Sequence, residues 1–177
     1  MGAGADLTCG SRTGGLRYQL RPANFSDWAG LHRLLTVSFS YMDGRVDPPS
    51  SLNSMVPDDL RRKAMEECLV VVFHGDELVA CGFLTEAGDS IYLGKLAVSP
   101  NFRRRGILRR MVELAEDMAF RQGRSWLELQ TRIELTENHR IFEALGFAKV
   151  RETAHPGFEQ PTSITMRKRV SDGRARP

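Results

Sequence analysis

The feature that most constrains the fold is an arginine-rich turn between an apolar, strand-like segment and a long amphipathic segment. The strand-like segment 90–98 leads into Ser99-Pro100, and Arg103-Arg104-Arg105-Gly106 follows within a few residues. The segment 106–122 then carries apolar residues at helical spacing. A strand, a short turn and a helix in this order place the start of the helix at the end of the strand, which is typical of α/β folds.

The rest of the chain alternates between strand-like and helix-like segments, without a repeat or a linker. The predicted elements are strand 16–21, helix 27–39 with Ser26 as its N-cap, helix 57–67, strands 68–73, 77–85 and 90–98, helix 106–122, strand 125–131, helix 137–145, and strands 148–152 and 163–169. We predict an α/β (α+β) fold, with a mixed sheet and helices on both of its faces. Residues 1–15 and 171–177 hold almost no large apolar side chains, so we expect a flexible arm and tail around one domain of residues 16–170.

Composition places the chain among ordinary globular proteins and limits its partners. Of its 177 residues, 41% are hydrophobic and 27% are charged, and the net charge of +3 hints at an anionic partner. Its three cysteines show no metal-ligand spacing, so we expect no metal site, and their odd number disfavours a secreted disulfide framework. The chain lacks the run of ~20 apolar residues that spans a bilayer. It also lacks a signal-peptide pattern, so we expect a cytoplasmic protein without a membrane partner.

The arginine-rich turn has the chemistry of an anion site. The first N–H groups of a helix have no acceptor within the helix, and the helix dipole is positive at that end. Gly106 allows a ligand to approach the backbone, and Arg103 to Arg105 add positive charge. The predicted ligand is a phosphate or pyrophosphate, but no Gly-Lys-Ser/Thr follows, so the turn is not a P-loop. A solvated basic helix start is the alternative interpretation.

Two segments resemble motifs of the GCN5-related N-acetyltransferase (GNAT) superfamily. Leu93-Gly-Lys-Leu-Ala-Val-Ser-Pro-Asn-Phe-Arg-Arg-Arg-Gly-Ile-Leu108 is similar to its acetyl-coenzyme A motif, Arg/Gln-x-x-Gly-x-Gly/Ala after a strand ending Leu-x-Val-x-Pro. Arg103 and Gly106 match this motif, whereas Leu108 stands where Gly or Ala is usual. The segment 137–147 is similar to the family's Asn-x-x-x-Tyr-x-x-x-Gly-Phe, with Asn138 at the asparagine and Phe142 at the tyrosine.

The resemblance implies a mixed, mostly antiparallel central sheet of about seven strands and acetyl-coenzyme A (acetyl-CoA) as cofactor. Strand 90–98 would then splay from strand 125–131 around a bulge, and the pantetheine arm would pair with the exposed backbone as an added strand does. Backbone N–H groups of residues 104–108 would hold the pyrophosphate, Asn138 would hydrogen-bond the pantetheine, and Phe142 would lie near the sulfur. The implied cofactor-binding residues are Leu96, Ala97, Val98, Arg103, Arg104, Arg105, Gly106, Ile107, Leu108, Asn138 and Phe142.

Acetyl transfer to an amine requires a polarised thioester carbonyl and an acceptor for the amine proton. Following the resemblance, we expect the backbone N–H of Val98, at the bulge, to polarise the carbonyl. Glu128 is our first choice for the base, with an ion pair to an arginine as an equally weighted alternative. Tyr92 stands where some family members carry a catalytic glutamate, and its alternative role is that of a pocket-wall aromatic.

The acceptor pocket, by the same resemblance, is expected between the loop after the first helix and the loop between the last two strands. Tyr41, Asp43 and Gln130 are candidate substrate-binding residues, because acids beside aromatics suit a cationic amine. We expect the acceptor to be a small-molecule amine. His155 is expected to lie at the surface.

Two other functions are alternatives to acetyl transfer. A non-catalytic acyl-CoA-binding module is the alternative favoured by the departures at Leu108 and Phe142. A nucleic-acid partner is not expected, because aromatic residues are not interleaved with the arginines as a base-stacking surface requires. A homodimer stays open, since many members of the superfamily are dimers.

Overall fold

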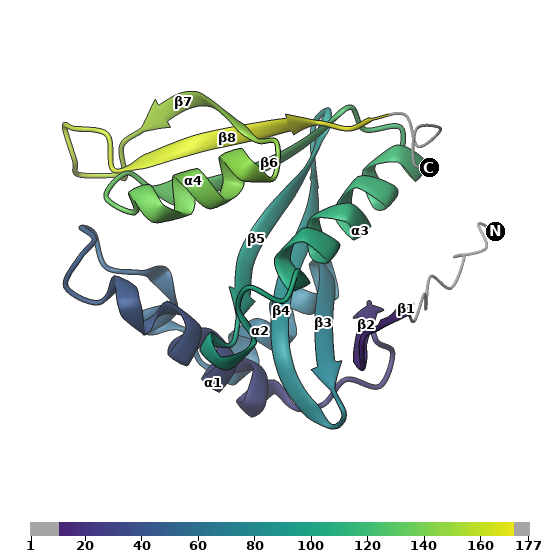
Figure 1. The fold of residues 1–177 in the computed structure, drawn as a ribbon. Coiled ribbons are helices and arrows are strands. Elements are labelled where there is room, and N and C mark those ends of the chain that lie inside the picture. The colour runs from purple at the N-terminus through teal and green to yellow at the C-terminus, as the bar shows by residue number, and fades with distance from the viewer. Residues whose placement is uncertain (1–10, 172–177) are drawn as a thin grey trace.

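The computed structural model describes residues 11–171, which form one eight-stranded sheet with the order β1-β2-β3-β4-β5-β6-β8-β7 (Figure 1). The strands are β1 (Ser11–Thr13), β2 (Leu16–Leu20), β3 (Cys68–His74), β4 (Glu77–Ala87), β5 (Ser90–Val98), β6 (Trp126–Arg132), β7 (Ala148–Thr153) and β8 (Ser163–Arg169). Every neighbouring pair is antiparallel except β5 and β6, which are parallel. The predicted mixed, mostly antiparallel sheet is therefore confirmed.

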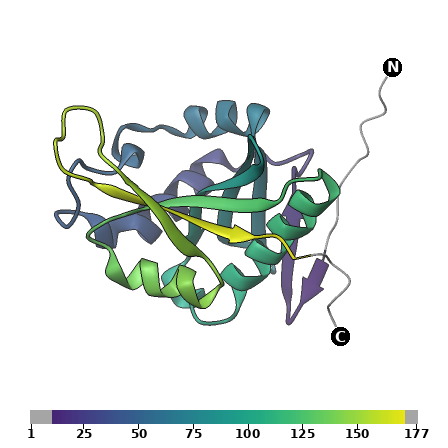
Figure 2. The same ribbon diagram turned by 90° about the horizontal axis from the view of Figure 1, so that it is seen from above.

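Helices cover both faces of the sheet, as Figure 2 shows from above. The four α-helices are α1 (Trp28–Phe39), α2 (Pro57–Glu66), α3 (Ile107–Arg121) and α4 (Thr136–Ala144), and the 3-10 turns are η1 (Ser40–Met42), η2 (Ser51–Ser54) and η3 (Pro100–Phe102). Each face has its own apolar core, one under α3 and one under α1 and α2. No helix in the described part of the chain is both long enough and apolar enough to cross a bilayer.

The first strand corrects the predicted N-terminal arm. Ser11–Thr13 pairs antiparallel with β2, and the turn between them holds Gly14 and Gly15, both at positive φ. Glycine adopts this conformation without steric cost, so the two glycines allow a tight hairpin. The sequence-based expectation considered only the scarcity of apolar side chains and therefore missed this hairpin. The prediction of a flexible arm is therefore wrong for residues 11–15, and residues 1–10 and 172–177 lie outside the described residues.

Local capping fixes where the first two helices begin. The Asp27 side chain accepts a 2.8 Å hydrogen bond from Gly30 N, so Asp27 rather than the predicted Ser26 is the N-cap of α1. At α2, Val56 N donates to Asp59 Oδ2 at 2.8 Å, and proline occupies the first helical position. Both starts therefore fall within one residue of the prediction.

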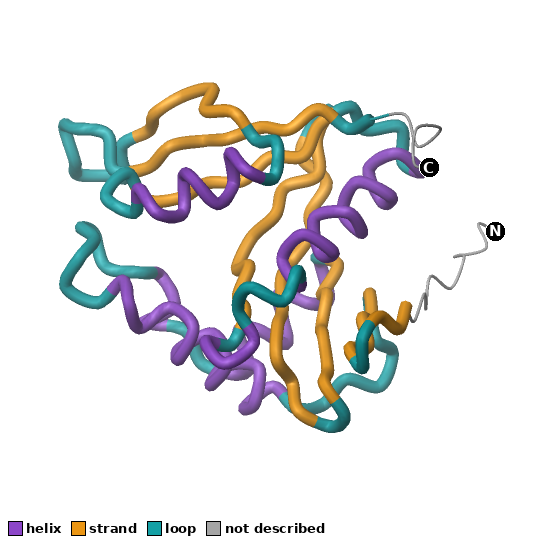
Figure 3. The backbone as a smooth tube through the Cα atoms, in the orientation of Figure 1, coloured by secondary structure: helices purple, strands orange, loops and turns teal. Residues whose placement is uncertain are grey.

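The splay between β5 and β6 is the feature that opens the molecule. The two strands pair only over Ser90–Tyr92 and Trp126–Glu128. Beyond this point β6 turns away with β8, β7 and α4, while β5 continues beside β4, so the two strands form a V (Figures 1 and 3). The predicted splay of these two strands is confirmed.

A bulge in β5 accompanies the splay. Cys81 pairs with Ala97 and Phe83 pairs with Gly94, so Lys95 and Leu96 together oppose the single residue Gly82. Lys95 has a φ of 50°, in the left-handed region, which accommodates the extra residue. The prediction placed the bulge at Val98, but Val98 is regularly paired with Ala80.

We expect Phe83→Ala to lower the free energy of unfolding by about 3–5 kcal/mol, because Phe83 is fully buried in the core under α1 and α2. Denaturant titration followed by circular dichroism measures the change. Phe120→Ala is the matched control, since Phe120 is 54% exposed on α3 and its loss should change stability by no more than about 0.5 kcal/mol. Equal effects of the two substitutions would contradict the described core.

Candidate active site

The turn before α3 presents unpaired backbone N–H groups, as the sequence predicted for an anion site. The first hydrogen bond of the helix runs from Arg110 N to Gly106 O at 3.0 Å, so the N–H groups of residues 107–109 precede any acceptor within the helix. Arg104 and Gly106 both have positive φ, at 61° and 76°. A Cβ built on Gly106 would have no heavy atom within 4 Å apart from those of its two chain neighbours, so the space above this backbone is open. The turn therefore fits a phosphate-bearing group.

The arginine side chains brace this turn against the rest of the fold. Arg103 donates to Ser38 O at 3.1 Å and to Val98 O at 3.4 Å, and its guanidinium lies 5.6 Å from the centre of the Tyr41 ring. Arg105 lies 4.7 Å from the ring centre of Phe102. These contacts tie η3 to the end of α1, so the backbone of the turn, more than the Arg103 side chain, is positioned for an anion.

The edge of β5 beyond the splay has backbone groups that face the gap. Ser99 N donates to Val79 O at 2.8 Å, so Ser99 belongs to a hydrogen-bonded pair with β4. Because successive residues of a strand alternate in direction, the N–H and C=O of Val98 point away from β4. The side chain of Ala97 is buried in the core under α1 and α2, so Ala97 does not face the gap with its side chain. The Val98 backbone therefore fits the added-strand pairing expected for a pantetheine arm.

A cavity of about 550 Å³ occupies the splay between β5 and β6. Its lining residues include, of those predicted as site residues, Tyr41, Tyr92, Leu96, Gln130, Asn138 and Phe142. Asp43 and Glu128 are not among the lining residues, and Asp43 is exposed. The structure thus brings the predicted aromatic and amide groups together, but not the two predicted acids.

Contacts from the segment after α1 bridge the splay beside this cavity. Asn138 Nδ2 donates to Tyr41 Oη at 2.8 Å, and Arg45 forms a 2.7 Å ion pair with Glu137. Both contacts join the N-terminal half of the molecule to α4, across the V. Asn138 therefore has a partner on the opposite wall, and its amide oxygen and second Nδ2 hydrogen are left for a pantetheine amide.

Tyr92 stands at the point where the two strands part, since it is the last residue of β5 that pairs with β6. Burial raises the pKa of its phenol above the usual value, and the charge of Glu128 raises it further. A hydrogen bond with the Gln130 backbone acts in the opposite direction. At neutral pH the phenol is therefore protonated, and it can donate a proton or hydrogen bond into the cavity.

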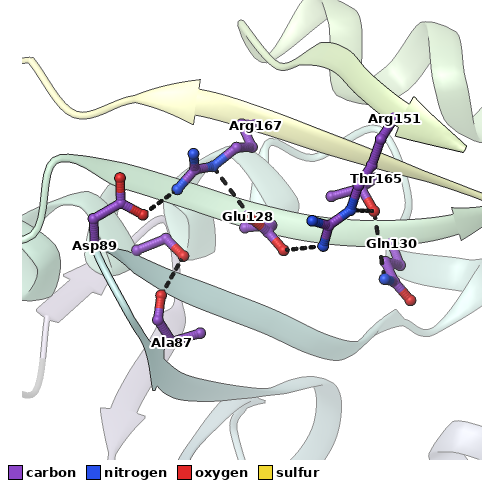
Figure 4. Close-up of polar contacts among 8 residues, drawn as sticks. Ala87, Asp89, Glu128, Gln130, Arg151, Thr165 and Arg167 are labelled. Carbon is purple, nitrogen blue, oxygen red and sulfur yellow. Dashed lines mark hydrogen bonds and ion pairs between the residues drawn. The ribbon is translucent and has the colours of Figure 1, made fainter. Parts of the chain in front are cut away.

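Glu128 is engaged in ion pairs on the sheet face that Figure 4 shows. Its carboxylate lies 3.2 Å from Arg167 Nε and 3.4 Å from Arg151 Nη2, and its side chain is 16% exposed. Arg167 also pairs with Asp89, and Arg151 donates to Thr165 at 3.2 Å. The structure favours the ion-pair role of Glu128 over the role of base, because accepting a proton would weaken its contacts with both guanidinium groups.

Sequence reasoning missed the basic groups that line the cavity, namely Lys63, Lys95, Arg132 and His155. Arg132 donates to the carbonyls of Pro48 and Pro49 and, at 3.1 Å, contacts His155 Nδ1. His155 lies in the loop between β7 and β8, where it is half-buried and contacts Arg132 and Thr162. Lys95 could have been recognised from the sequence as a candidate site residue, because it is a lysine inside an otherwise apolar strand.

We expect Gly106→Val to weaken coenzyme A binding by ~100-fold or more, which corresponds to the loss of one or two hydrogen bonds to a charged group. Isothermal titration calorimetry measures the affinity. Gly88→Val is the matched control, because Gly88 has a φ of 59°, equally open space above its Cα, and a position in the β4–β5 turn. Both substitutions strain the backbone. Unchanged affinity in Gly106→Val, or an equal loss in both, would contradict this site.

We expect Glu128→Gln to lower the free energy of unfolding by about 1–3 kcal/mol while turnover changes little, because Arg151 and Arg167 lose their shared carboxylate. Glu152→Gln is the control, since the Lys149–Glu152 pair is at the surface and is worth about 0–1 kcal/mol. Thermal denaturation and initial-rate assays provide the two readouts. Unchanged stability with a ~100-fold loss of turnover would restore Glu128 as the base.

Comparison with solved structures finds the same fold in several acetyltransferases. The PaiA N-acetyltransferase from Thermoplasma acidophilum, in complex with coenzyme A, is 15% identical with a TM-score of 0.70, over 86% of this chain and 98% of that one. A probable acetyltransferase from Staphylococcus epidermidis is 16% identical with a TM-score of 0.69, over 88% and 99%. The ribosomal-protein-S18-alanine N-acetyltransferase from Escherichia coli is 16% identical with a TM-score of 0.62, over 90% and 99%. At these identities the likeness shows the fold.

Comparison of the sequence itself settles the family. A search of curated protein sequences gave no significant match. The model of the acetyltransferase (GNAT) family matches residues 28–147, which run from α1 through both motif segments to Phe147. With the turn before α3 and the splay between β5 and β6 in place, the chain belongs to the acetyltransferase (GNAT) family, whose members are N-acetyltransferases that use acetyl-CoA.

Proposed function

We propose that this acetyltransferase moves the acetyl group of acetyl-CoA to the amine of a small molecule, by direct attack of the amine on the thioester. The observation that carries the proposal is the cavity of about 550 Å³ in the splay, which extends from Leu96 on β5 to the loop after α1. A volume of this size suits a small-molecule site. The contacts of Tyr41 and Arg45 with α4 bridge the splay, and we propose that a small amine reaches the cavity more readily past them than a folded protein does.

The residues around the splay have distinct tasks in this reaction. Bound acetyl-CoA supplies the thioester carbonyl that the amine attacks and the thiolate that leaves. The N–H of Val98 faces the gap and is the proposed donor to the carbonyl oxygen. Tyr92, protonated at neutral pH, is the proposed donor to the thiolate. Phe142 lines the cavity and packs against Phe147 with ring centres 5.9 Å apart, which suits an apolar shield for the sulfur.

The amine must lose its proton, since a free alkyl amine has a pKa of about 10.4. With Glu128 held by two arginines, we propose that the amine reacts from its neutral fraction and releases the proton to water. The rate at low amine concentration should then rise with pH toward the pKa of the amine itself. A plateau at lower pH would identify a base on the protein instead.

Two buried thiols bear on where the protein works. Cys68 and Cys81 are both free and buried, and burial raises the pKa of each thiol. Thiols kept in the protonated form are poor nucleophiles and resist oxidation. This agrees with the proposed cytoplasmic location, where the environment is reducing.

The test of the proposed function is an initial-rate assay of coenzyme A release from acetyl-CoA across a broad panel of small amines, peptides and proteins. We expect acetylation of at least one class of small amine, identified by mass spectrometry of the product. Acetylation of peptides or proteins alone would contradict the proposed acceptor class. Tight coenzyme A binding with no turnover on any amine would instead favour an acyl-CoA-binding module.

We expect Phe142→Tyr to leave acetyl-CoA affinity nearly unchanged and to change kcat modestly, because the proposed reaction does not need a hydroxyl at this position. Phe142→Ala should weaken acetyl-CoA binding, since the contacts with the cavity and with Phe147 are lost. Calorimetry and steady-state kinetics separate the two effects. If Phe142→Tyr turned a protein without detectable turnover into an active enzyme, the direct-attack account would be wrong.

A further inference from the structure

The acceptor end of the cavity contains two lysines that the proposed reaction does not use. Lys95 lies at the bulge of β5 and Lys63 lies on α2, and both line the cavity beside Ser50 and Ser51. Lys95 Nζ donates to Ser51 Oγ at 2.8 Å. An ammonium has three donors, so two remain for a ligand.

The other basic side chains on the cavity wall already have hydrogen-bond or ion-pair partners. The guanidinium of Arg132 donates hydrogen bonds to the carbonyls of Pro48 and Pro49 and contacts His155. Lys63 forms an ion pair with Glu67. Lys95 has no carboxylate within ion-pair distance among residues 11–171, and no aspartate or glutamate is among the lining residues. Lys95 and Arg132 therefore give the wall an excess of positive charge, and Lys95 is the one whose hydrogen-bond partner is a hydroxyl, that of Ser51.

The position of Lys95 is unfavourable for a charged group without a ligand. Burial lowers the pKa of its ammonium, the neighbouring Lys63 lowers it further, and Glu67 acts against them. The residue also takes the left-handed conformation at the bulge, which directs a long basic side chain to Ser51 on the cavity wall. A bound anion beside the Lys95 ammonium would offset both the cost of its burial and its repulsion by Lys63.

We propose that the acceptor is an amine that also carries a carboxylate, and that Lys95, with Lys63 and Ser51 beside it, binds that carboxylate. The proposal rests on the proposed function, because it names the substrate class of the same cavity. It replaces the sequence-based expectation of an acid-lined pocket for a purely cationic amine. A cavity of about 550 Å³ admits a molecule the size of an amino acid beside the thioester end.

Binding of product analogues tests this without relying on turnover. The coenzyme A-loaded protein is titrated calorimetrically with N-acetyl amino acids and with their carboxamides, which differ only in the charged group. We expect the best acid to bind at least ~10-fold more tightly than its amide, the usual scale for a hydrogen bond to a charged group. Equal binding of acids and amides, or no binding of either, would overturn the proposal.

Three variants assign the effect to Lys95. Lys95→Met should abolish the preference for acids, and Lys95→Arg should retain most of it, which also shows that the bulge still folds. Lys149→Met is the control, because Lys149 is an exposed lysine on β7, away from the cavity lining, and the preference should be unchanged. A preference that survives in Lys95→Met would contradict the assignment.

The acetylation assay distinguishes the two proposals. Equal acetylation of amino acids and of amines without a carboxylate would refute the carboxylate site and leave the acetyltransferase proposal standing. Preferential acetylation of carboxylate-bearing amines, lost in Lys95→Met, would support both. Coenzyme A binding without acetylation of either class would refute the proposed function, whatever the analogues bind.

Discussion

The active site depends on the loss of backbone pairing between β5 and β6 after Tyr92 and Glu128. Buried backbone N–H and C=O groups must find partners, and an unpaired strand edge is the usual place to accept another extended chain. Here the edge of β5 lies beside a cavity and ends at the turn before α3. One departure from regular sheet geometry therefore exposes the edge of β5 and opens the cavity beside it, where we propose that the cofactor and the acceptor bind.

Different parts of the chain keep β5 and β6 apart and connect the two walls of the splay. On the inner side, the bulge at Lys95 and the apolar core of α3 keep β5 beside β4. At the mouth, Tyr41 and Arg45 contact Asn138 and Glu137 on α4. These polar contacts are few and partly exposed, so they can exchange for contacts with a ligand at little loss of free energy. The two walls of the site are thus held by sheet pairing and core packing, while the polar contact between them is exchangeable.

The sequence predicted what local chemistry determines. Helical spacing and the glycine at 106 located α3, and the two motif segments contain Asn138 and Phe142, which both line the cavity. The prediction from sequence failed where the role of a residue or the presence of a strand depends on a neighbour that is distant in sequence. The arginines that hold Glu128 come from β7 and β8, and β1 depends on a hairpin of two glycines. The basic character of the acceptor end was missed because Lys63 and Lys95 come from different elements and meet only in the fold.

The crystal structure of the protein with coenzyme A bound tests the central claim most directly. The account predicts the pantetheine arm along the β5 edge, placed so that the N–H of Val98 stays available for the thioester carbonyl of acetyl-CoA. It also predicts the pyrophosphate over Gly106, at the start of α3, and the sulfur beside Phe142 and Tyr92. Coenzyme A bound away from the splay, or a β5–β6 ladder that continues past Tyr92 with the ligand elsewhere, would contradict the account.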